Sequence, residues 1–373
     1  MRRLLTGLLL VALVAACGGS SDDGGGETAA TVPSTTTTTV PPCNPAPLED
    51  RAATTLLVGL PGTTDPAAPL AAEVAALGVG GVLLTDTNVR GPDQARAFVT
   101  GLRAASPRAL LVAVDDEGGR VSSTSALAPR GPSARRLGAA GPDAAQEAGR
   151  SLGTTLASID VDVALAPVAD LDGGPAGGVI GDRSFGTEPA AVAAAATAFA
   201  EGLRESGVAA TAKHFPGHAG AADSHDGPAT VDRSVAALES ADLVPFDALV
   251  EDGVRLVMLG HVAYSGLGPM PASLEPGAYR LLRDTGFDGV AVTDSLGMGA
   301  INLRWPFPEA AVRAVLAGAD LALATDGSYA RAMRDELVSA VRVGRLPEER
   351  LDEAVTRVLR LRGEDPASMV CPG

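Results

Sequence analysis

The feature that most constrains the fold is a pattern that repeats eight times from residue 54 onward. In each repeat, a short apolar run that is often β-branched is followed by a turn and then by a stretch rich in Ala and Leu. Strands that alternate with helices are typical of a parallel sheet. The expected strands are residues 55–59, 80–85, 109–114, 161–168, 209–213, 256–259, 289–293 and 320–324.

Eight such repeats suit a closed (β/α)8 barrel, the TIM barrel, as a single α/β domain. Helical patterns lie at residues 70–77, 94–105, 144–159, 190–207, 308–317 and 328–343, and we expect Asp65 and Asp93 to cap helices. An open doubly wound sheet is the alternative fold. It usually carries a Gly-rich phosphate loop after its first strand, and the PGT at 61–63 is not such a loop.

The charged residues restrict the partners. The formal net charge is −16, and an acidic chain repels phosphate backbones, so we expect no nucleic acid partner. Lys213 is the only lysine, and every other basic residue is Arg. A codon bias toward Arg explains the others, but a lone lysine in a His-rich segment indicates a position that needs a compact ammonium.

The N-terminus has the pattern of an export signal. Arg2 and Arg3 precede an apolar run at 4–16 that is too short to span a bilayer comfortably. Small residues before Cys17 resemble the lipobox of bacterial lipoproteins, which implies that Cys17 receives a diacylglycerol thioether. The alternative is an ordinary secretory signal with a chance Cys. We therefore expect an exported protein that is lipid-anchored to the extracytoplasmic face of the cell membrane.

Three segments follow from these patterns: a signal peptide at 1–16, a lipidated Cys with a tether at 17–47, and the barrel domain at 48–373. The tether is rich in Gly, Ser, Thr and Pro, so we expect it to be disordered. Cys43 and Cys371 flank the domain. Because an exported protein meets an oxidising environment, we expect them to form a disulfide, with two unpaired thiols as the alternative.

Ionisable residues gather where the expected strands end. The third strand ends in DDEGGR at 115–120, the fifth in KHFPGH at 213–218, the sixth near His261 and the seventh at Asp294. Catalytic residues of a barrel lie at the carboxyl ends of its strands. The convergence of four strand ends at one rim therefore predicts an active site.

Two kinds of chemistry suit these residues. A metal site is conceivable from His214, His218, Asp223 and His225, but Lys213 beside them would place a cation next to the metal. We therefore expect no metal and no cofactor. Glycoside hydrolysis instead needs one group to attack the anomeric carbon and one to protonate the leaving oxygen.

Four motifs resemble those of glycoside hydrolase family 3, in its β-N-acetylglucosaminidase branch. They are DDEGGR at 115–120, RSFG at 183–186, KHFPGH at 213–218 followed by DSH at 223–225, and VTDSLGM at 292–298. The resemblance covers nearly all of residues 55–325, in the family's order. It implies a retaining enzyme that removes terminal β-linked N-acetylglucosamine, with a GlcNAc-containing glycan or a muropeptide as its substrate.

The resemblance also implies roles for individual residues. Asp294 corresponds to the nucleophile, His225 to the general acid/base and Asp223 to the partner that orients it. The groups that would grip the sugar hydroxyls are Asp115, Arg183, Lys213 and His214. An Asp two residues from a His can hold one ring nitrogen and fix the tautomer, which suits acid/base work near neutral pH. A helix N-cap for Asp294 and a solvent-exposed loop position for His225 are the competing interpretations.

Other residues at the rim are expected to be structural. We expect this of His218 and His261, and we expect Asp116 and Glu117 to be partners of Arg120. Two positions depart from the family pattern: Ala219 stands where Gly is usual, and Ser123 stands where some members carry a basic residue. The second departure weakens the case for a muropeptide substrate.

Several functions remain as alternatives. A β-glycoside phosphorylase, a β-glucosidase or a β-xylosidase would share the covalent intermediate. A non-catalytic sugar-binding lipoprotein would not need Asp294 together with the Asp223–His225 pair.

Overall fold

A computed structural model describes residues 44–218 and 220–371. The chain divides into Met1–Pro42 and a compact unit, Cys43–Gly373. The predicted signal peptide, Cys17, nearly all of the predicted tether and Cys43 lie outside the described residues. Cys371 is disulfide-bonded, and its predicted pairing with Cys43 remains a prediction. In the described part of the chain, no helix is long and apolar enough to cross a membrane.

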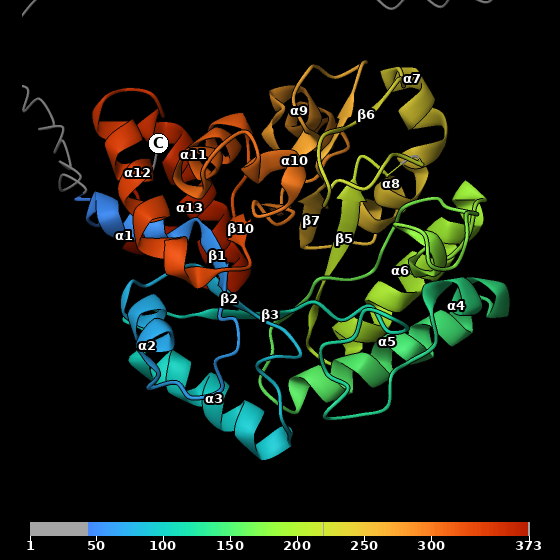
Figure 1. The fold of residues 1–373 in the computed structure, drawn as a ribbon, viewed down its shortest axis with the longest axis horizontal. Coiled ribbons are helices and arrows are strands. Elements are labelled where there is room, and N and C mark those ends of the chain that lie inside the picture. Colours follow the sequence, from blue (N-terminus) through green and yellow to red (C-terminus); the bar gives the residue numbers. More distant parts are fainter. Residues whose placement is uncertain (1–43, 219, 372–373) are drawn as a thin grey trace, which may run out of the picture. The chain divides into compact units, whose positions relative to one another are not determined.

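The centre of the compact unit is an eight-stranded parallel sheet with the strand order β10-β1-β2-β3-β4-β5-β7-β9 (Figure 1). These strands are β1 Leu56–Gly59, β2 Gly81–Leu84, β3 Leu111–Val114, β4 Val163–Ala164, β5 Ala209–Phe215, β7 Leu256–Leu259, β9 Val290–Thr293 and β10 Ala322–Ala324. A parallel bridge between Val292 and Leu321 joins the two edges. The sheet is therefore a nearly closed barrel, and the predicted (β/α)8 class is confirmed.

Helices surround the barrel (Figure 1). They are α1 Leu48–Thr54, α2 Pro69–Ala76, α3 Pro92–Ala105, α4 Ala134–Ala140, α5 Pro142–Ala157, α6 Pro189–Glu205, α7 Val235–Ala237, α8 Val244–Glu251, α9 Pro276–Asp284, α10 Gly299–Asn302, α11 Phe307–Ala317, α12 Ala330–Arg342 and α13 Glu348–Arg362. Shorter turns are the 3-10 segments η1 Gly181–Arg183, η3 Ala272–Leu274, η4 Gly327–Tyr329 and η5 Pro366–Ser368, and the π segment η2 Leu238–Asp242.

The predicted elements agree with the structure except in details. All eight strands and the six predicted helices are present, but β4 is only two residues long, and beyond it the pairing with β5 continues through an isolated bridge between Val168 and Lys213. A further two-stranded sheet, β6 Ala229–Val231 with β8 Val262–Tyr264, was not predicted. The predicted caps were wrong: α3 starts after Gly91 with Asp93 inside its first turn, and Asp65 instead accepts a hydrogen bond from Ala67 N at 2.9 Å.

The barrel interior and the helical layer have separate cores. Leu57 belongs to an inner cluster, whereas Leu56 and Val58 pack in an outer cluster that includes the helices, as expected when strand side chains alternate. The inner cluster includes Val358 and Leu361. Helix α13 therefore supplies part of the barrel's inner packing.

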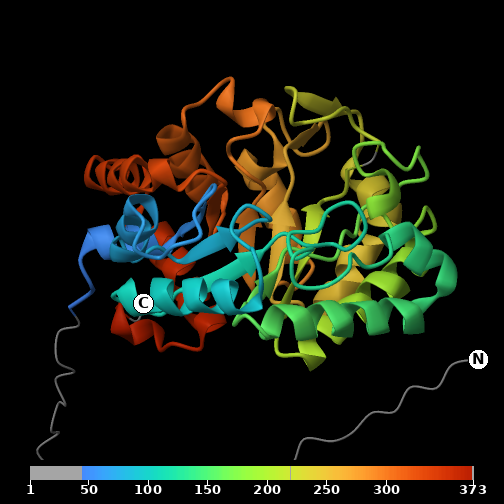
Figure 2. The same ribbon diagram turned by 60° about the horizontal axis from the view of Figure 1, so that its bottom comes forward.

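Helices of the outer layer pack against one another through small residues, as the contact between α5 and α6 shows. Helices α5 and α6 run side by side (Figure 2). A Cβ on Gly202 would lie 2.1 Å from Gln146 O, and a Cβ on Gly149 would lie 2.1 Å from Phe199 O. Only glycine permits such a close approach, which is how a chain with 3% aromatic residues packs this layer tightly.

Candidate active site

A cavity of about 800 Å³ opens at the carboxyl ends of the strands. Leu83, Leu165, Met258 and Leu323 of the inner cluster contribute to its lining. All seven predicted catalytic and substrate-binding residues line it: Asp115, Arg183, Lys213, His214, Asp223, His225 and Asp294. The barrel thus brings together residues that are up to 179 positions apart in the chain, from Asp115 to Asp294 (294 − 115).

Lys213 joins two carboxylates at the base of the site. Its Nζ lies 2.7 Å from Asp115 Oδ1 and 2.7 Å from Glu117 Oε1, and the side chain is 2% exposed. Burial alone would lower the pKa of Lys213. The charges of Asp115 and Glu117 raise this pKa by more than burial lowers it, so the net shift is upward. The side chain is therefore the charged, compact ammonium that its isolation in the sequence indicated.

Glu117 is the buried anion between two cations. Arg183 donates to it through both Nε and Nη2 at 2.7 Å, in a bidentate pair, and Lys213 is its third donor. Burial alone would raise the pKa of Glu117, but Lys213 and Arg183 outweigh it and lower the pKa to about 2. Glu117 thus holds Arg183 and Lys213 in fixed positions at the cavity wall.

The predicted pairing of Asp116 and Glu117 with Arg120 was wrong. Arg120 Nε donates to Asp182 Oδ1 at 2.9 Å, in the segment that follows β4. Asp116 is buried and accepts from its own loop, from Thr124 N at 2.9 Å and Thr124 Oγ1 at 2.6 Å. The backbone turns sharply after Glu117, so these neighbouring side chains point in different directions.

His214 is oriented by a residue that the sequence analysis missed. Its Nδ1 lies 2.7 Å from Asp170 Oδ2, and the same carboxylate accepts from His218 N at 2.7 Å. Asp170 is completely buried. Burial alone would raise the pKa of its carboxyl group, but the contact with His214 outweighs burial, so the net shift of the pKa is downward. With Nδ1 as the donor, Nε2 faces Arg183 Nη2 at 3.5 Å as the acceptor. Asp170 follows the fourth strand, so the strand-end rule could have found it.

Asp294 follows β9 directly. Its Oδ1 accepts from Ser295 N at 2.7 Å, and its backbone N donates to Leu259 O at 2.9 Å. Burial raises the pKa of Asp294, but His214 and His261 outweigh it, so the net shift is downward and the carboxylate is ionised at neutral pH. Because α10 begins only at Gly299, the alternative interpretation of Asp294 as a helix N-cap was wrong.

Asp223 and His225 form a hydrogen-bonded pair on the loop after β5. His225 Nδ1 lies 2.7 Å from Asp223 Oδ1, which also accepts from His225 N at 2.9 Å. The His225 side chain is 63% exposed, yet it lines the cavity together with Asp294. The backbone N–H of His225 is the main cause of a lowered pKa at Asp223. A charged carboxylate on Nδ1 leaves Nε2 as the ring nitrogen for chemistry.

The loop after β5 that carries Asp223 and His225 rests on the segment that follows β9. Gly299 N donates to His225 O at 3.0 Å, and Ala300 N donates to Ser224 O at 3.0 Å. A Cβ on Gly299 would lie 2.5 Å from His225 O. The loop therefore approaches so closely because residue 299 has no side chain. Ala219, which departs from the family pattern, lies outside the described residues.

The two remaining site histidines are both buried but differ in their contacts, since the Nε2 of His218 makes no hydrogen bond to any described residue. His261 Nε2 lies 2.8 Å from Ser295 O and therefore donates, while Nδ1 accepts from Ser273 Oγ at 2.7 Å. Burial lowers the pKa of both His218 and His261. Ser123 donates to Asp115 O at 2.6 Å and so supports the third strand end. In residues 44–218 and 220–371, no three His, Cys, Asp or Glu side chains are grouped to hold a metal ion.

Known proteins resemble this chain in sequence and in fold. The family described as "Glycosyl hydrolase family 3 N terminal domain" matches residues 50–361. The β-hexosaminidase LpqI of Mycobacterium tuberculosis is 40% identical over 329 residues, which cover 85% of this chain and 83% of that protein. A β-hexosaminidase of Methylococcus capsulatus is 39% identical over 249 residues, covering 65% of this chain and 74% of that protein.

Solved structures agree with these relatives. The structure of M. tuberculosis LpqI superimposes with a TM-score of 0.79 at 38% identity, covering 85% of this chain and 94% of that one. A family 3 β-N-acetylglucosaminidase from Paenibacillus sp. str. FPU-7 superimposes with a TM-score of 0.80 at 32% identity. The match covers 88% of this chain and 64% of the Paenibacillus chain, which is less than two thirds of its length.

The barrel and its charged, sugar-sized rim cavity define a glycoside hydrolase, an enzyme whose substrate is a carbohydrate. The chain belongs to glycosyl hydrolase family 3.

Proposed function

We propose that this enzyme is a retaining exo-β-N-acetylglucosaminidase that removes terminal β-linked N-acetylglucosamine. The observation that carries the proposal is that an ionised Asp294 and the hydrogen-bonded Asp223–His225 pair line one cavity. The names of the relatives support the sugar: LpqI is a β-hexosaminidase, and the Paenibacillus protein is a β-N-acetylglucosaminidase.

In the proposed first step, the Asp294 carboxylate attacks the anomeric carbon. An ester bond to the sugar forms as the glycosidic bond breaks, and His225 gives a proton to the leaving oxygen. The Asp223 carboxylate, 2.7 Å from Nδ1, stabilises the imidazolium before transfer and holds the ring in place. In the second step, His225 takes a proton from water as the water attacks the anomeric carbon, and Asp294 is released.

The opposite wall of the cavity is proposed to bind the sugar hydroxyls. Asp115 accepts from Lys213, and its remaining oxygen can accept from a hydroxyl. Arg183 and His214 are held by buried carboxylates, Glu117 and Asp170, so their positions are set before the substrate arrives. Groups held in advance lose little entropy on binding, which favours a specific orientation of the sugar ring.

We further propose that the enzyme is exported, anchored through Cys17, and acts on peptidoglycan fragments outside the membrane. The support is the N-terminal sequence: a basic start, an apolar run, and small residues before Cys17. Labelling with a radioactive fatty acid in a bacterial host tests the anchor. Incorporation into the wild type and none into Cys17→Ser is the expected result.

The activity is tested with nitrophenyl β-glycosides of N-acetylglucosamine, glucose and xylose. We expect the N-acetylglucosaminide to be hydrolysed fastest, and proton NMR to show β-N-acetylglucosamine as the first anomer released. The α anomer as first product would contradict a retaining mechanism. Formation of a sugar 1-phosphate when inorganic phosphate is present would identify a phosphorylase instead.

A further inference from the structure

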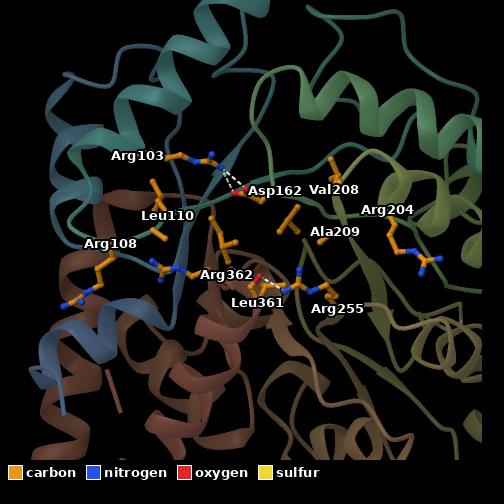
Figure 3. Close-up of a pocket in the computed structure, with 14 residues that line it drawn as sticks. Arg103, Arg108, Leu110, Asp162, Arg204, Val208, Ala209, Arg255, Leu361 and Arg362 are labelled. Carbon is orange, nitrogen blue, oxygen red and sulfur yellow. Dashed lines mark hydrogen bonds and ion pairs between the residues drawn. The ribbon is translucent and has the colours of Figure 1, made fainter. Parts of the chain in front are cut away.

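A second cavity, of about 470 Å³, is drawn in close-up in Figure 3. Its lining residues place it at the end of the barrel opposite the catalytic rim. It is lined where strands begin, by Leu111 of β3, Val163 of β4 and Ala209 of β5, whereas the catalytic residues follow strand ends. Leu361 and Arg362 at the end of α13 complete it. We call this cavity the lower pocket.

The lower pocket is strongly cationic in an acidic protein. Five arginines line it, namely Arg103, Arg108, Arg204, Arg255 and Arg362, and Asp162 is the only carboxylate among its lining residues. The whole chain has the opposite balance, with 45 acidic against 29 basic residues. Charge of one sign in a concave, low-dielectric wall attracts ligands of the other sign.

Arg362 lies at the centre of this group (Figure 3). Its side chain is 1% exposed, and none of its three guanidinium nitrogens makes a hydrogen bond to any described residue. The nearest carboxylate is Glu364, with an oxygen 3.8 Å from Nη2, which is beyond hydrogen-bond distance. A buried guanidinium that donates to nothing is costly, so this position is expected to hold an acceptor.

The other arginines differ in how far they are neutralised. Arg103 is matched by Asp162, with contacts of 2.7 and 2.8 Å. Arg255 donates to the carbonyl oxygens of Arg360 and Leu361, and it has no carboxylate within 4 Å among the described residues. Among the described residues, Arg255 therefore has no carboxylate partner, and Arg362 has only Glu364, which at 3.8 Å is too far to accept a hydrogen bond.

We infer that the lower pocket binds a phosphoryl dianion, either inorganic phosphate or the phosphate of a small phosphomonoester. Two guanidinium groups without a hydrogen-bonded carboxylate, those of Arg255 and Arg362, can both donate to one phosphoryl group, and the planar fork of Arg suits the tetrahedral oxygens of a phosphate. The volume lies within the range of small-molecule sites. Leu110, Val208 and Leu361 provide apolar lining for the carbon part of an ester.

Isothermal titration calorimetry on the full-length chain tests this inference, in a phosphate-free buffer of low ionic strength. The probes are inorganic phosphate and glycerol 3-phosphate. We expect one anion per chain, and tighter binding of glycerol 3-phosphate if the apolar lining contacts the ester. Arg362→Met should weaken binding by at least about tenfold, the loss expected for a charge-assisted contact.

Two control variants locate the site. Arg345→Met removes an exposed arginine that is already paired with Glu309 and Glu336, and Arg120→Met removes an arginine of the catalytic cavity. Both should bind phosphate as the wild type does. Equal loss in Arg120→Met would place the anion in the catalytic cavity and overturn the inference, as would the absence of binding to the wild type.

A second variant covers the case in which Arg362→Met does not fold. Arg204 lies at the edge of the pocket with 59% exposure, so Arg204→Glu should fold normally, which circular dichroism will show. The reversed charge should weaken phosphate binding severalfold at low salt and less at high salt, because exposed charges are screened. Unchanged affinity in every folded lower-pocket variant would contradict the proposal.

Discussion

The structure explains why the only lysine of the chain stands at position 213. Its ammonium contacts Asp115 and Glu117 at 2.7 Å each while remaining buried. An Arg at this position would place a wider, planar group between two carboxylates, one of which, Glu117, is already bound by Arg183. The lone lysine of the sequence is thus explained by the space that the site leaves for a cation.

The division of labour between Asp294 and His225 gives a prediction at the residue scale. Nitrophenolate leaves without protonation, so His225→Ala should still transfer the sugar to Asp294. Water attack then lacks its base and should slow by about 10² to 10⁴. Stopped-flow should show a burst of nitrophenol followed by slow turnover, and intact mass should show one sugar on the quenched variant.

Asp294→Ala should show neither the burst nor the added mass, and almost no hydrolysis of any substrate. Asp223→Ala should resemble His225→Ala in a milder form, because Asp223 only orients the imidazole and tunes its charge. Full activity of Asp294→Ala or His225→Ala on a natural disaccharide would refute these assignments.

The sequence predicted the site residues more fully than their partners. Residues that follow strands share one rim in any barrel, so topology alone brought Asp115, Lys213 and Asp294 together. The partner of Glu117 depends on the direction in which a loop turns, which the local sequence does not encode. Asp170 was missed because it belongs to no motif, although its place after β4 follows the same rule.

At the scale of elements, we expect the contact between α10 and the loop that carries Asp223 and His225 to set the position of the proposed acid/base. Gly299→Ala would bring a Cβ to 2.5 Å from His225 O, so the loop must shift. We expect kcat to fall by about 10²-fold on disaccharides, which need protonation of the leaving group. Nitrophenyl glycosides, which do not need it, should lose less in their glycosylation step.

Gly227→Ala is the matched control, since it lies on the same loop and a Cβ there meets nothing within 4 Å. It should keep wild-type kinetics on both substrate types. Equal losses of Gly299→Ala on both types, with a lowered melting temperature, would indicate a general loss of structure rather than a displaced acid/base.

Strands were easier to predict than helices for a physical reason. Barrel strands are buried on both sides and therefore appear as continuous apolar runs, as in LLVG of β1 and LVML of β7. Helices α9 and α13 carry apolar residues on one face only and are otherwise highly charged. The pair of β6 and β8 has only three residues in each strand, too few to show a period.

At the scale of the whole molecule, Asp320 links the barrel edges to α9 and α13. It is completely buried, and it accepts from Ala291 N at 2.9 Å, Arg283 at 2.7 Å and Arg350 at 2.7 Å. Asp320→Ala leaves these arginines without their shared anion. We expect a loss of about 3–5 kcal/mol in the free energy of unfolding, measured by urea denaturation.

Asp335→Ala serves as the comparison for that measurement. Asp335 is exposed and its ion pair is with the adjacent Arg334, so its removal should change the unfolding free energy by no more than about 0.5 kcal/mol. Similar losses in the two variants would show that Asp320 does not hold the barrel edges together.

The backbone contact of Gly299 and Ala300 with the loop that carries His225 has a consequence for how such an enzyme can change. The proposed nucleophile and the two residues whose backbone N–H groups bind the loop of the proposed acid/base lie within seven residues of one another, from Asp294 to Ala300. The spacing of the two proposed reacting groups therefore depends on two strand ends, the one that carries Asp294 and the loop after β5 that carries His225. We expect loops at the remaining strand ends to be free to lengthen, shorten or acquire new sugar contacts without changing that spacing.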